Sequence, residues 1–188
     1  MHDDNWSGTA LVVGTGGIGQ AILERLQHRF PHLTLVTAGR QGEPRHQLQL
    51  DLESDSDLER LAPALQQIGP PLRLVFNCSG RLHGPGLQPE KRLTQLTRES
   101  LMEQFAINAF APVLLAKAVE PLLERNRPFH FASLSARVGS ITDNRSGGWY
   151  SYRAAKSAQN QLLKTLSIEW SRRWPNATVT LLHPGTTD

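Results

Sequence analysis

A glycine-rich turn near the N-terminus constrains the fold of this chain more than any other stretch. The apolar run Thr9–Val13 predicts a buried strand, and Gly14, Gly16 and Gly19 follow it with the spacing G-x-G-x-x-G. Apolar residues at helical spacing then continue to Phe30, which places the turn between a strand and a helix. A dinucleotide-binding turn needs this context, because its glycines permit a tight turn and close approach of a pyrophosphate to the helix N-terminus. We therefore predict a dinucleotide site at Gly14, Thr15, Gly16, Gly17, Ile18 and Gly19.

The rest of the chain alternates between strand and helix patterns. The further strands expected are 33–37, 47–50, 72–76, 129–134 and 178–182, and helical patterns cover 54–68, 99–125 and the region from 150 to 170. Such alternation predicts an α/β fold with a doubly wound parallel sheet, Rossmann-like, in three α/β/α layers. The 188 residues contain no repeat or linker, so we expect one NAD(P)-binding domain over residues 1–188. Residues 81–97 are predicted to form a loop, and Pro112 to kink or rearrange the helix around it.

Composition narrows the cellular setting. Hydrophobic residues make up 39% of the chain and charged residues 20%, as in soluble globular proteins. Apolar runs such as Phe110–Ala116 are too short to span a bilayer, the N-terminal residues do not resemble a signal peptide, and the single Cys78 suits a reducing compartment. The net charge of +3 comes from scattered basic residues. We expect a cytoplasmic protein that binds neither membrane nor nucleic acid, and we predict no metal site.

Arg40 follows the second predicted strand, where the cofactor preference of a dinucleotide site is set. Sites that prefer NAD place an acidic residue about 20 residues after the glycines, against the ribose hydroxyls. No acidic residue occupies that place here, and Arg40 suits a 2′-phosphate. The alternative is that Arg40 is a solvated loop residue. We predict NADP(H) in preference to NAD(H).

Tyr152 and Lys156 are the residues with the most distinctive chemistry. They are four residues apart at the start of a helical pattern, so both side chains point to one face of the helix. An ammonium beside a phenol favours the phenolate, and we expect it to lower the pKa of Tyr152 from its usual value of about 10. The pair thus predicts a tyrosine that exchanges a proton with a substrate oxygen.

These features together resemble the classical short-chain dehydrogenases/reductases, over essentially the whole chain. Tyr152-x-x-x-Lys156 is similar to the family's catalytic Tyr and Lys, and Asn108 to its structural and catalytic Asn. The segments 138–144 and 147–150 resemble the branch of C-factor-like proteins and sniffer-type carbonyl reductases. The resemblance implies that Asn108 positions a water that links Lys156 to solvent, and that Lys156 binds the nicotinamide ribose.

The same resemblance extends the predicted cofactor site. Asn77-Cys78-Ser79-Gly80 is similar to the family's Asn-Asn-Ala-Gly turn, and Asp51 to its adenine-contacting Asp. Pro184-Gly185 is similar to the Pro-Gly loop near the nicotinamide. The cofactor residues implied beyond the glycine turn and Arg40 are Asp51, Leu52, Asn77, Ser79, Gly80, Tyr152, Lys156, Pro184 and Gly185.

Two features depart from the family pattern. The family's catalytic Ser stands three residues before a Gly, and counting back from Gly139 gives Ala136. Either the loop is shifted and Ser135 serves, or the Ser role is missing; we favour Ser135. Family members also continue past Pro184-Gly185 with further elements, so the chain resembles a form truncated at its C-terminus.

Two functions are compatible with the sequence. One is an NADP(H)-dependent oxidoreductase of carbonyl reductase or alcohol dehydrogenase type, which acts on a small-molecule carbonyl or alcohol with Tyr152 as general acid or base. The other is an NAD(P)-binding regulatory or signalling protein of C-factor type with little or no turnover. The resemblance also implies a homodimer or homotetramer. A Tyr152→Phe variant should separate the two functions.

Overall fold

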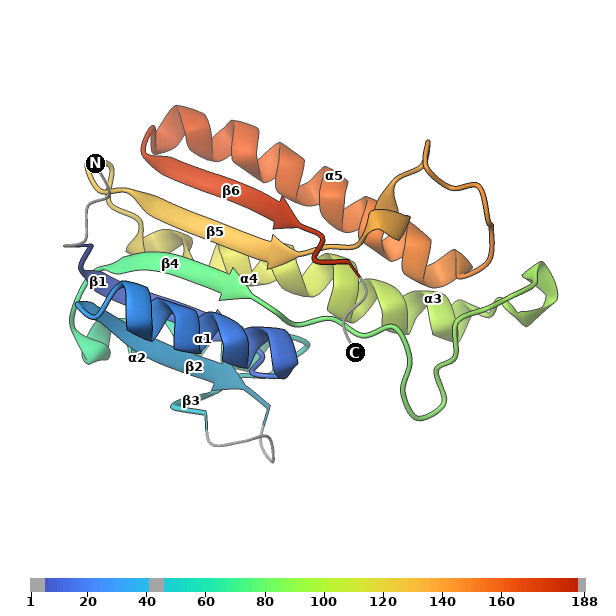
Figure 1. Ribbon diagram of the computed structural model, residues 1–188, viewed down its shortest axis with the longest axis horizontal. Helices are drawn as coiled ribbons and strands as arrows, with labels where there is room; N and C mark the ends of the chain where they lie inside the picture. Colours follow the sequence, from blue (N-terminus) through green and yellow to red (C-terminus); the bar gives the residue numbers. More distant parts are fainter. Residues whose placement is uncertain (1–5, 41–45, 186–188) are drawn as a thin grey trace.

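A six-stranded parallel sheet forms the centre of the protein (Figure 1). The computed structural model describes residues 6–40 and 46–185. The strand order is β3-β2-β1-β4-β5-β6, and every neighbouring pair is parallel. This order confirms the predicted doubly wound sheet, with its reversal point between β1 and β4. The strands are β1 (Gly8–Val13), β2 (Leu33–Gly39), β3 (Leu48–Gln49, shorter than expected), β4 (Leu72–Asn77), β5 (Phe129–Leu134) and β6 (Ala177–Leu182).

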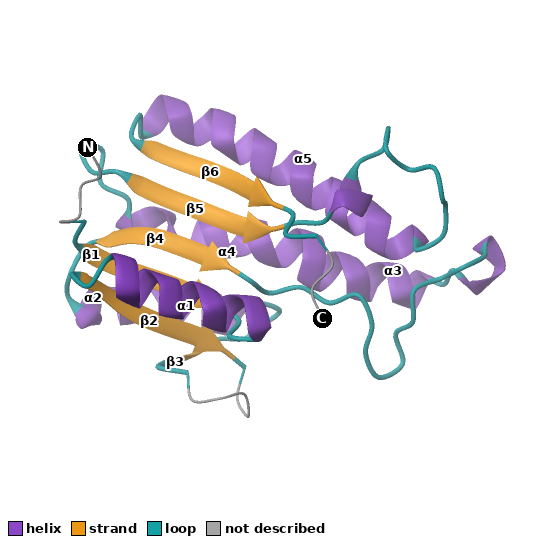
Figure 2. Ribbon diagram, in the orientation of Figure 1, coloured by secondary structure: helices purple, strands orange, loops and turns teal. Residues whose placement is uncertain are grey.

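Helices cover both faces of the sheet and complete the three layers (Figure 2). The first helix of the chain lies on one face of the sheet, and the helices that follow it lie on the other (Figure 1). The two faces are built from alternate residues of the same strands: Leu11 and Val13 join one apolar cluster, and Ala10 and Val12 join the other. The helices are α1 (Gly17–Arg29), α2 (Asp55–Ile68), α3 (Arg98–Phe105), α4 (Ala111–Val119) and α5 (Tyr150–Arg173).

The helical stretch expected over 99–125 changes its winding in the middle. Between α3 and α4 the segment Ala106–Phe110 is a π-helix, and Pro112 lies in the first turn of α4. Proline lacks an N–H and its ring crowds the preceding turn, so the wider π-turn is the local rearrangement predicted at this point. A 3₁₀ turn, Glu120–Leu122, ends the stretch. The π-turn directs Asn108 inward, where it is fully buried.

This stretch is also the apolar part of the chain. Among the described residues, the continuous helical run Arg98–Leu122 is long and apolar enough to cross a membrane, by length and composition only. The contiguous apolar runs of the sequence, such as Phe110–Ala116, are shorter, and no spanning segment was expected from them. The inner side of this helical run packs in the core, where Ala111, Leu115 and Val119 are fully buried. We attribute the apolar composition to this packing.

Candidate active site

The glycine turn lies at the carboxyl edge of the sheet, between β1 and α1. Gly14 has a φ of +82°, which favours glycine, and a Cβ on Gly19 would lie 2.0 Å from the Gly14 carbonyl oxygen. Gly16 is the N-cap residue of α1, and a Cβ on Gly16 or Gly17 would meet nothing within 4 Å. The turn is therefore tight on its inner side and open on its outer side, beside the free N–H groups of the helix.

A cavity of about 300 Å³ opens beside this turn and reaches the ends of β2 and β4. Thr15 Oγ1 is buried and has no hydrogen-bond partner among the described residues, and Arg40 is exposed at the end of β2. A buried hydroxyl without a partner, an open glycine backbone and a cation fit the phosphates and sugar of a dinucleotide. Eight predicted cofactor residues line this cavity: Gly14, Thr15, Gly16, Arg40, Asp51, Leu52, Ser79 and Gly80.

Asn77 holds the turn that follows β4. Its Oδ1 accepts hydrogen bonds from the Ser79 N–H at 3.1 Å and the Ser79 hydroxyl at 2.5 Å. Its Nδ2 donates to Ser133 Oγ on β5 at 3.1 Å. Asn77 is fully buried and holds Ser79, which lines the cavity, and its own contact with a cofactor stays a prediction.

A second hollow, of about 440 Å³, continues along the same edge toward β5. It is lined by residues of the glycine turn, by Cys78 and by Leu134. Burial raises the pKa of the Cys78 thiol to about 12, so the thiol is neutral and unreactive at physiological pH. The two hollows together follow the carboxyl ends of β2, β1, β4 and β5.

Tyr152 and Lys156 lie on α5 at the β5 end of this edge. The Lys156 Nζ is 5.8 Å from the centre of the Tyr152 ring. It donates hydrogen bonds to the Leu134 carbonyl oxygen at 3.1 Å and to Gln159 Oε1 at 3.0 Å. Among the described residues the Tyr152 hydroxyl has no hydrogen-bond partner. The two side chains share one helix face, as predicted.

Burial moves both members of the pair toward their neutral forms. It lowers the pKa of Lys156 to about 8 and raises the pKa of Tyr152. The expectation that the ammonium lowers the Tyr152 pKa is therefore wrong for the protein without ligands. The physical reason is desolvation, which opposes charge on either group and here outweighs their mutual attraction.

Asn108 connects the π-turn to the segment after β4. Its Oδ1 accepts from the Arg81 N–H at 3.1 Å, and its Nδ2 donates to the Arg81 carbonyl at 2.8 Å and to Gln104 Oε1 at 2.6 Å. A Cβ on Gly80 would lie 3.2 Å from Asn108 Oδ1 and 3.5 Å from Lys156 Nζ. Asn108 and Lys156 therefore approach each other at Gly80.

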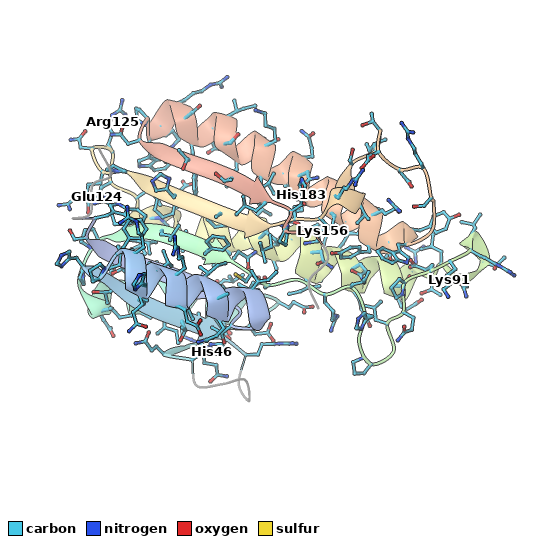
Figure 3. The ribbon with its side chains drawn as sticks, viewed as in Figure 1. His46, Lys91, Glu124, Arg125, Lys156 and His183 are labelled. Carbon is cyan, nitrogen blue, oxygen red and sulfur yellow. The ribbon has the colours of Figure 1, made fainter. Side chains whose placement is uncertain are left out.

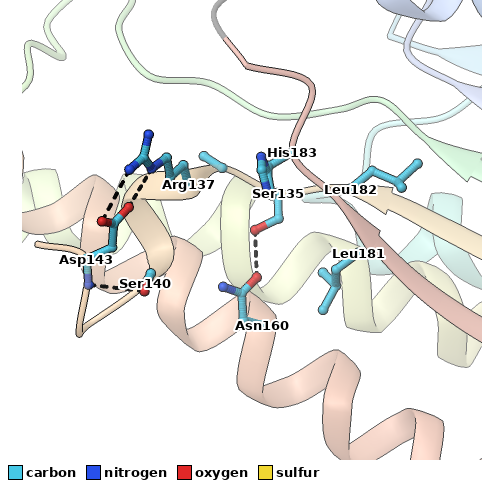
Figure 4. A pocket seen from close by; sticks show the side chains of 9 residues that line it. Ser135, Arg137, Ser140, Asp143, Asn160, Leu181, Leu182 and His183 are labelled. Atoms are coloured by element: carbon cyan, nitrogen blue, oxygen red, sulfur yellow. Dashed lines mark hydrogen bonds and ion pairs between the residues drawn. The ribbon is translucent and has the colours of Figure 1, made fainter.

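The Ser135 hydroxyl, which was expected to hold the substrate oxygen, bonds to a side chain of the protein. The hydroxyl donates to Asn160 Oδ1 on α5 at 2.6 Å (Figure 4). It lines a hollow of about 460 Å³ with Arg137 and His183, and Tyr152 is not among the residues that line this hollow. Ala136 lies next in the chain, at the position three residues before Gly139. A role for Ser135 at the substrate oxygen stays a prediction, and it requires the bond to Asn160 to break.

The predicted Pro184-Gly185 loop lies at the same edge, just after β6. Gly185 has a φ of +87°, so the chain turns sharply there. Lys156 and His183 both lie near the carboxyl ends of the strands (Figure 3). Within residues 6–40 and 46–185, no group of three or more His, Cys, Asp or Glu side chains could hold a metal ion.

Two buried residues near Tyr152 and Lys156 were not predicted from the sequence. Gln159 contacts Lys156, and Glu90 contacts the start of α5: its carboxylate accepts from the Ser151 hydroxyl at 2.6 Å, the Ser151 N–H at 3.3 Å and the Ser100 hydroxyl at 2.9 Å. Glu90 is only 2% exposed although it lies in a polar loop. No periodic pattern marks such residues, because their partners are far away in the sequence.

Comparisons with known proteins agree with this architecture. A family model described as enoyl-(acyl carrier protein) reductase matches residues 15–188. The 1-hydroxy-2-glutathionyl-2-methyl-3-butene dehydrogenase of Rhodococcus sp. (strain AD45) is 33% identical over 187 residues, which are 94% of this chain and 76% of that protein. The C-signal protein of Myxococcus xanthus is 37% identical over 82 residues, 43% of this chain and 48% of that protein.

Solved structures show the same fold. The carbonyl reductase Sniffer of D. melanogaster superposes with a TM-score of 0.82 at 25% identity, covering 96% of this chain and 81% of that one. A short-chain dehydrogenase/reductase from Burkholderia multivorans, solved with bound NADP, superposes with a TM-score of 0.78 at 22% identity over 96% and 80% of the two chains. The fold and the edge site define a nucleotide-binding α/β oxidoreductase. The chain belongs to the short-chain dehydrogenase/reductase family.

Proposed function

We propose that this protein is an NADP(H)-dependent oxidoreductase of the carbonyl reductase or alcohol dehydrogenase type. The observation that carries the proposal is the position of Tyr152 and Lys156 on one face of α5, at the edge of the sheet where the glycine turn is open. The substrate is a small-molecule carbonyl or alcohol. We further propose that residues 1–188 form one domain and that the protein is a cytoplasmic homodimer or homotetramer.

The cofactor is proposed to lie along the two hollows. The glycine turn and the Thr15 hydroxyl hold its phosphates, and Asp51 and Leu52 contact its adenine. Arg40 is proposed to face the 2′-phosphate, and the cation that directly follows β2 supports NADP(H) over NAD(H). The NADP bound in the Burkholderia multivorans relative supports the same choice. Lys156 and the Pro184-Gly185 loop border the nicotinamide end.

Bound NADPH would supply a hydride to the carbonyl carbon of the substrate. Tyr152 gives its proton to the carbonyl oxygen, which completes the alcohol, and Lys156 stabilises the phenolate that remains. The raised pKa of Tyr152 keeps it protonated before the reaction, as a general acid needs. With a pKa of about 8, Lys156 stays mostly charged at pH 7. Asn108 is proposed to position the water that returns a proton through Lys156, and Ser135 to hold the substrate oxygen.

A regulatory protein that binds NAD(P) without turnover is the second candidate. The observation that favours it is the match to the C-signal protein, over 43% of this chain. The two candidates share the cofactor site and differ in their need for the Tyr152 proton.

The experiment is a titration of the protein with NADPH and NADH, followed by tryptophan fluorescence, with wild type and Tyr152→Phe compared. We expect both proteins to bind NADPH more tightly than NADH. Only wild type should then oxidise NADPH in the presence of a panel of aldehydes and ketones; loss of one well-placed catalytic donor costs about 100-fold or more in rate. Tighter binding of NADH would overturn the Arg40 assignment. Turnover by Tyr152→Phe at the wild-type rate would overturn the mechanism, and binding without turnover in wild type would favour the regulator.

A further inference from the structure

A buried glutamine lies one helical turn after Lys156, and the chemistry proposed above does not use it. Gln159 is 0% exposed and lies on the inner side of α5. Its Oε1 accepts a hydrogen bond from Lys156 Nζ at 3.0 Å. Its Nε2 donates to Ser133 Oγ at 3.0 Å and to the Leu134 carbonyl oxygen at 3.1 Å. A buried amide is costly unless its groups are paired, and both ends of this one are.

The partners determine which way the amide faces. The Leu134 carbonyl oxygen only accepts hydrogen bonds, so the Nε2 of Gln159 must point toward β5. The Oε1 then has to face the ammonium of Lys156. An ammonium has three N–H donors, and the Leu134 carbonyl and Gln159 take two of them among the described residues. The third is left for a ligand at the nicotinamide end of the edge.

A chain of hydrogen bonds continues from Gln159 to the cofactor cavity. Ser133 Oγ also accepts from Asn77 Nδ2 at 3.1 Å, and Asn77 Oδ1 holds the N–H of Ser79, which lines the cavity. Asn77, Ser133 and Gln159 are all fully buried. The position of the Lys156 ammonium is thus tied through three side chains to the turn after β4.

No carboxylate is paired with Lys156 among the described residues. Tyr152 shares its face of α5, and Cys78 and Arg81 belong to the segment after β4 whose Gly80 lies beside the Lys156 Nζ. Glu103 Oε2 lies 3.7 Å from the guanidinium of Arg81, and the Cys78 thiol is neutral. The ammonium therefore relies on two neutral oxygens, of Leu134 and Gln159, in place of water.

We infer that Gln159 is a positioning residue for Lys156: its amide oxygen stabilises the charged ammonium and directs the remaining N–H toward the bound cofactor. This inference rests on the proposed function only for the role of Lys156 in turnover. The hydrogen-bonded state of the ammonium can be measured without turnover.

The test compares Gln159→Leu and Gln159→Glu with wild type and with Ser157→Ala. Ser157 is a control on the same helix, because within the described part of the chain its hydroxyl bonds to the Gly139 carbonyl oxygen, at 2.8 Å, and not to Lys156. The first measurement is the titration of the Lys156 Nζ signal by NMR, assigned by its loss in Lys156→Met. Removing an acceptor from a buried cation should lower the midpoint by about one pH unit in Gln159→Leu. The added carboxylate should raise it in Gln159→Glu, and Ser157→Ala should titrate as wild type does.

The second measurement is NADPH binding and carbonyl reduction between pH 6 and 10. We expect NADPH affinity and the rate of carbonyl reduction to fall at alkaline pH. In each variant the pH of this fall should shift in the same direction as the midpoint of the Lys156 titration. An unchanged midpoint in Gln159→Leu and Gln159→Glu, with folding intact by circular dichroism, would overturn the inference. An absence of turnover in wild type with shifted midpoints would overturn the proposed function and leave the role of Gln159 standing.

Discussion

At the residue scale, the chemistry depends on the competition between burial and charge at Tyr152 and Lys156. The adjacent ammonium favours a phenolate, but burial moves both groups toward neutrality. The hydrogen-bond acceptors of Lys156 are on β5 and on Gln159, so the tertiary structure determines what fraction of Lys156 stays protonated. A buried cation of this kind is kept at a cost in stability, as is common at active sites.

Replacement of Lys156 by methionine should stabilise the protein at neutral pH. The pKa of Lys156 is about 8 in the folded state and about 10.4 in an unfolded chain. Between these values the unfolded chain binds more protons, so stability rises with pH there, and the full penalty applies below pH 8. We expect Lys156→Met to gain about 1–3 kcal/mol in unfolding free energy at pH 7, and little at pH 10.5.

Urea denaturation at both pH values measures this difference. The control is Lys164→Met, an exposed position on the same helix, which should show no pH-dependent gain. A loss of stability in Lys156→Met at pH 7 would show that the hydrogen bonds of the ammonium outweigh its desolvation.

At the element scale, the loop 81–97 fixes the start of α5. The N-cap position is held by Trp149, a non-glycine residue with a φ of 54°, and its N–H donates to the Glu90 carbonyl oxygen. The carboxylate of Glu90 accepts from Ser151 and supplies the negative charge that a helix N-terminus favours. Tyr152 lies within this first turn, so a loop distant in sequence positions the proposed general acid.

Replacement of Glu90 by alanine should destabilise both the loop 81–97 and the first turn of α5. Loss of the carboxylate and of its hydrogen bonds to Ser151 and Ser100 should cost about 2 kcal/mol in unfolding free energy and expose the loop to trypsin at Lys91 and Arg92. Burial alone would raise the pKa of Glu90, but the hydrogen bonds it accepts, chiefly from Ser151 and Ser100, together outweigh this and lower the pKa. Its contribution to stability is therefore present above the unfolded pKa of about 4.3 and is lost as pH falls through the lower folded value.

Thermal melts at pH 7 and pH 3.5, with timed proteolysis, measure these effects. Glu99→Ala, at an exposed carboxylate in the first turn of α3, is the control. Equal melting temperatures and equal cleavage of the two variants would contradict the role given to Glu90.

At the scale of the whole molecule, Trp170 joins the far end of α5 to the sheet. It is fully buried, and its ring lies 5.7 Å from that of Phe129 and 6.1 Å from that of Phe131 on β5. Its Nε1 donates to Glu120 Oε2 at 2.9 Å. Since α5 carries Tyr152 and Lys156 at its other end, this contact anchors the helix at a distance from the chemistry.

Replacement of Trp170 by alanine should cost about 3–5 kcal/mol in unfolding free energy, through lost burial and a residual cavity. Trp170→Phe should cost less, because it keeps most of the apolar volume. Chemical denaturation measures both. The dissociation constant for NADPH, measured well below the melting temperature, should change little in the variants; a large change in a folded variant would show that the anchor also controls the site.

The order of elements, the parallel doubly wound sheet, the glycine turn and the Tyr152/Lys156 helix face were all predictable from the sequence. Each depends on local spacing: alternating segments, glycines where a Cβ would collide, and a four-residue step on a helix. Only the tertiary structure determined the π-turn at Asn108, the Ser135–Asn160 bond, and the burial of Glu90 and Gln159. These depend on which distant segments meet and on how much water is excluded where they meet, which residue spacing does not encode.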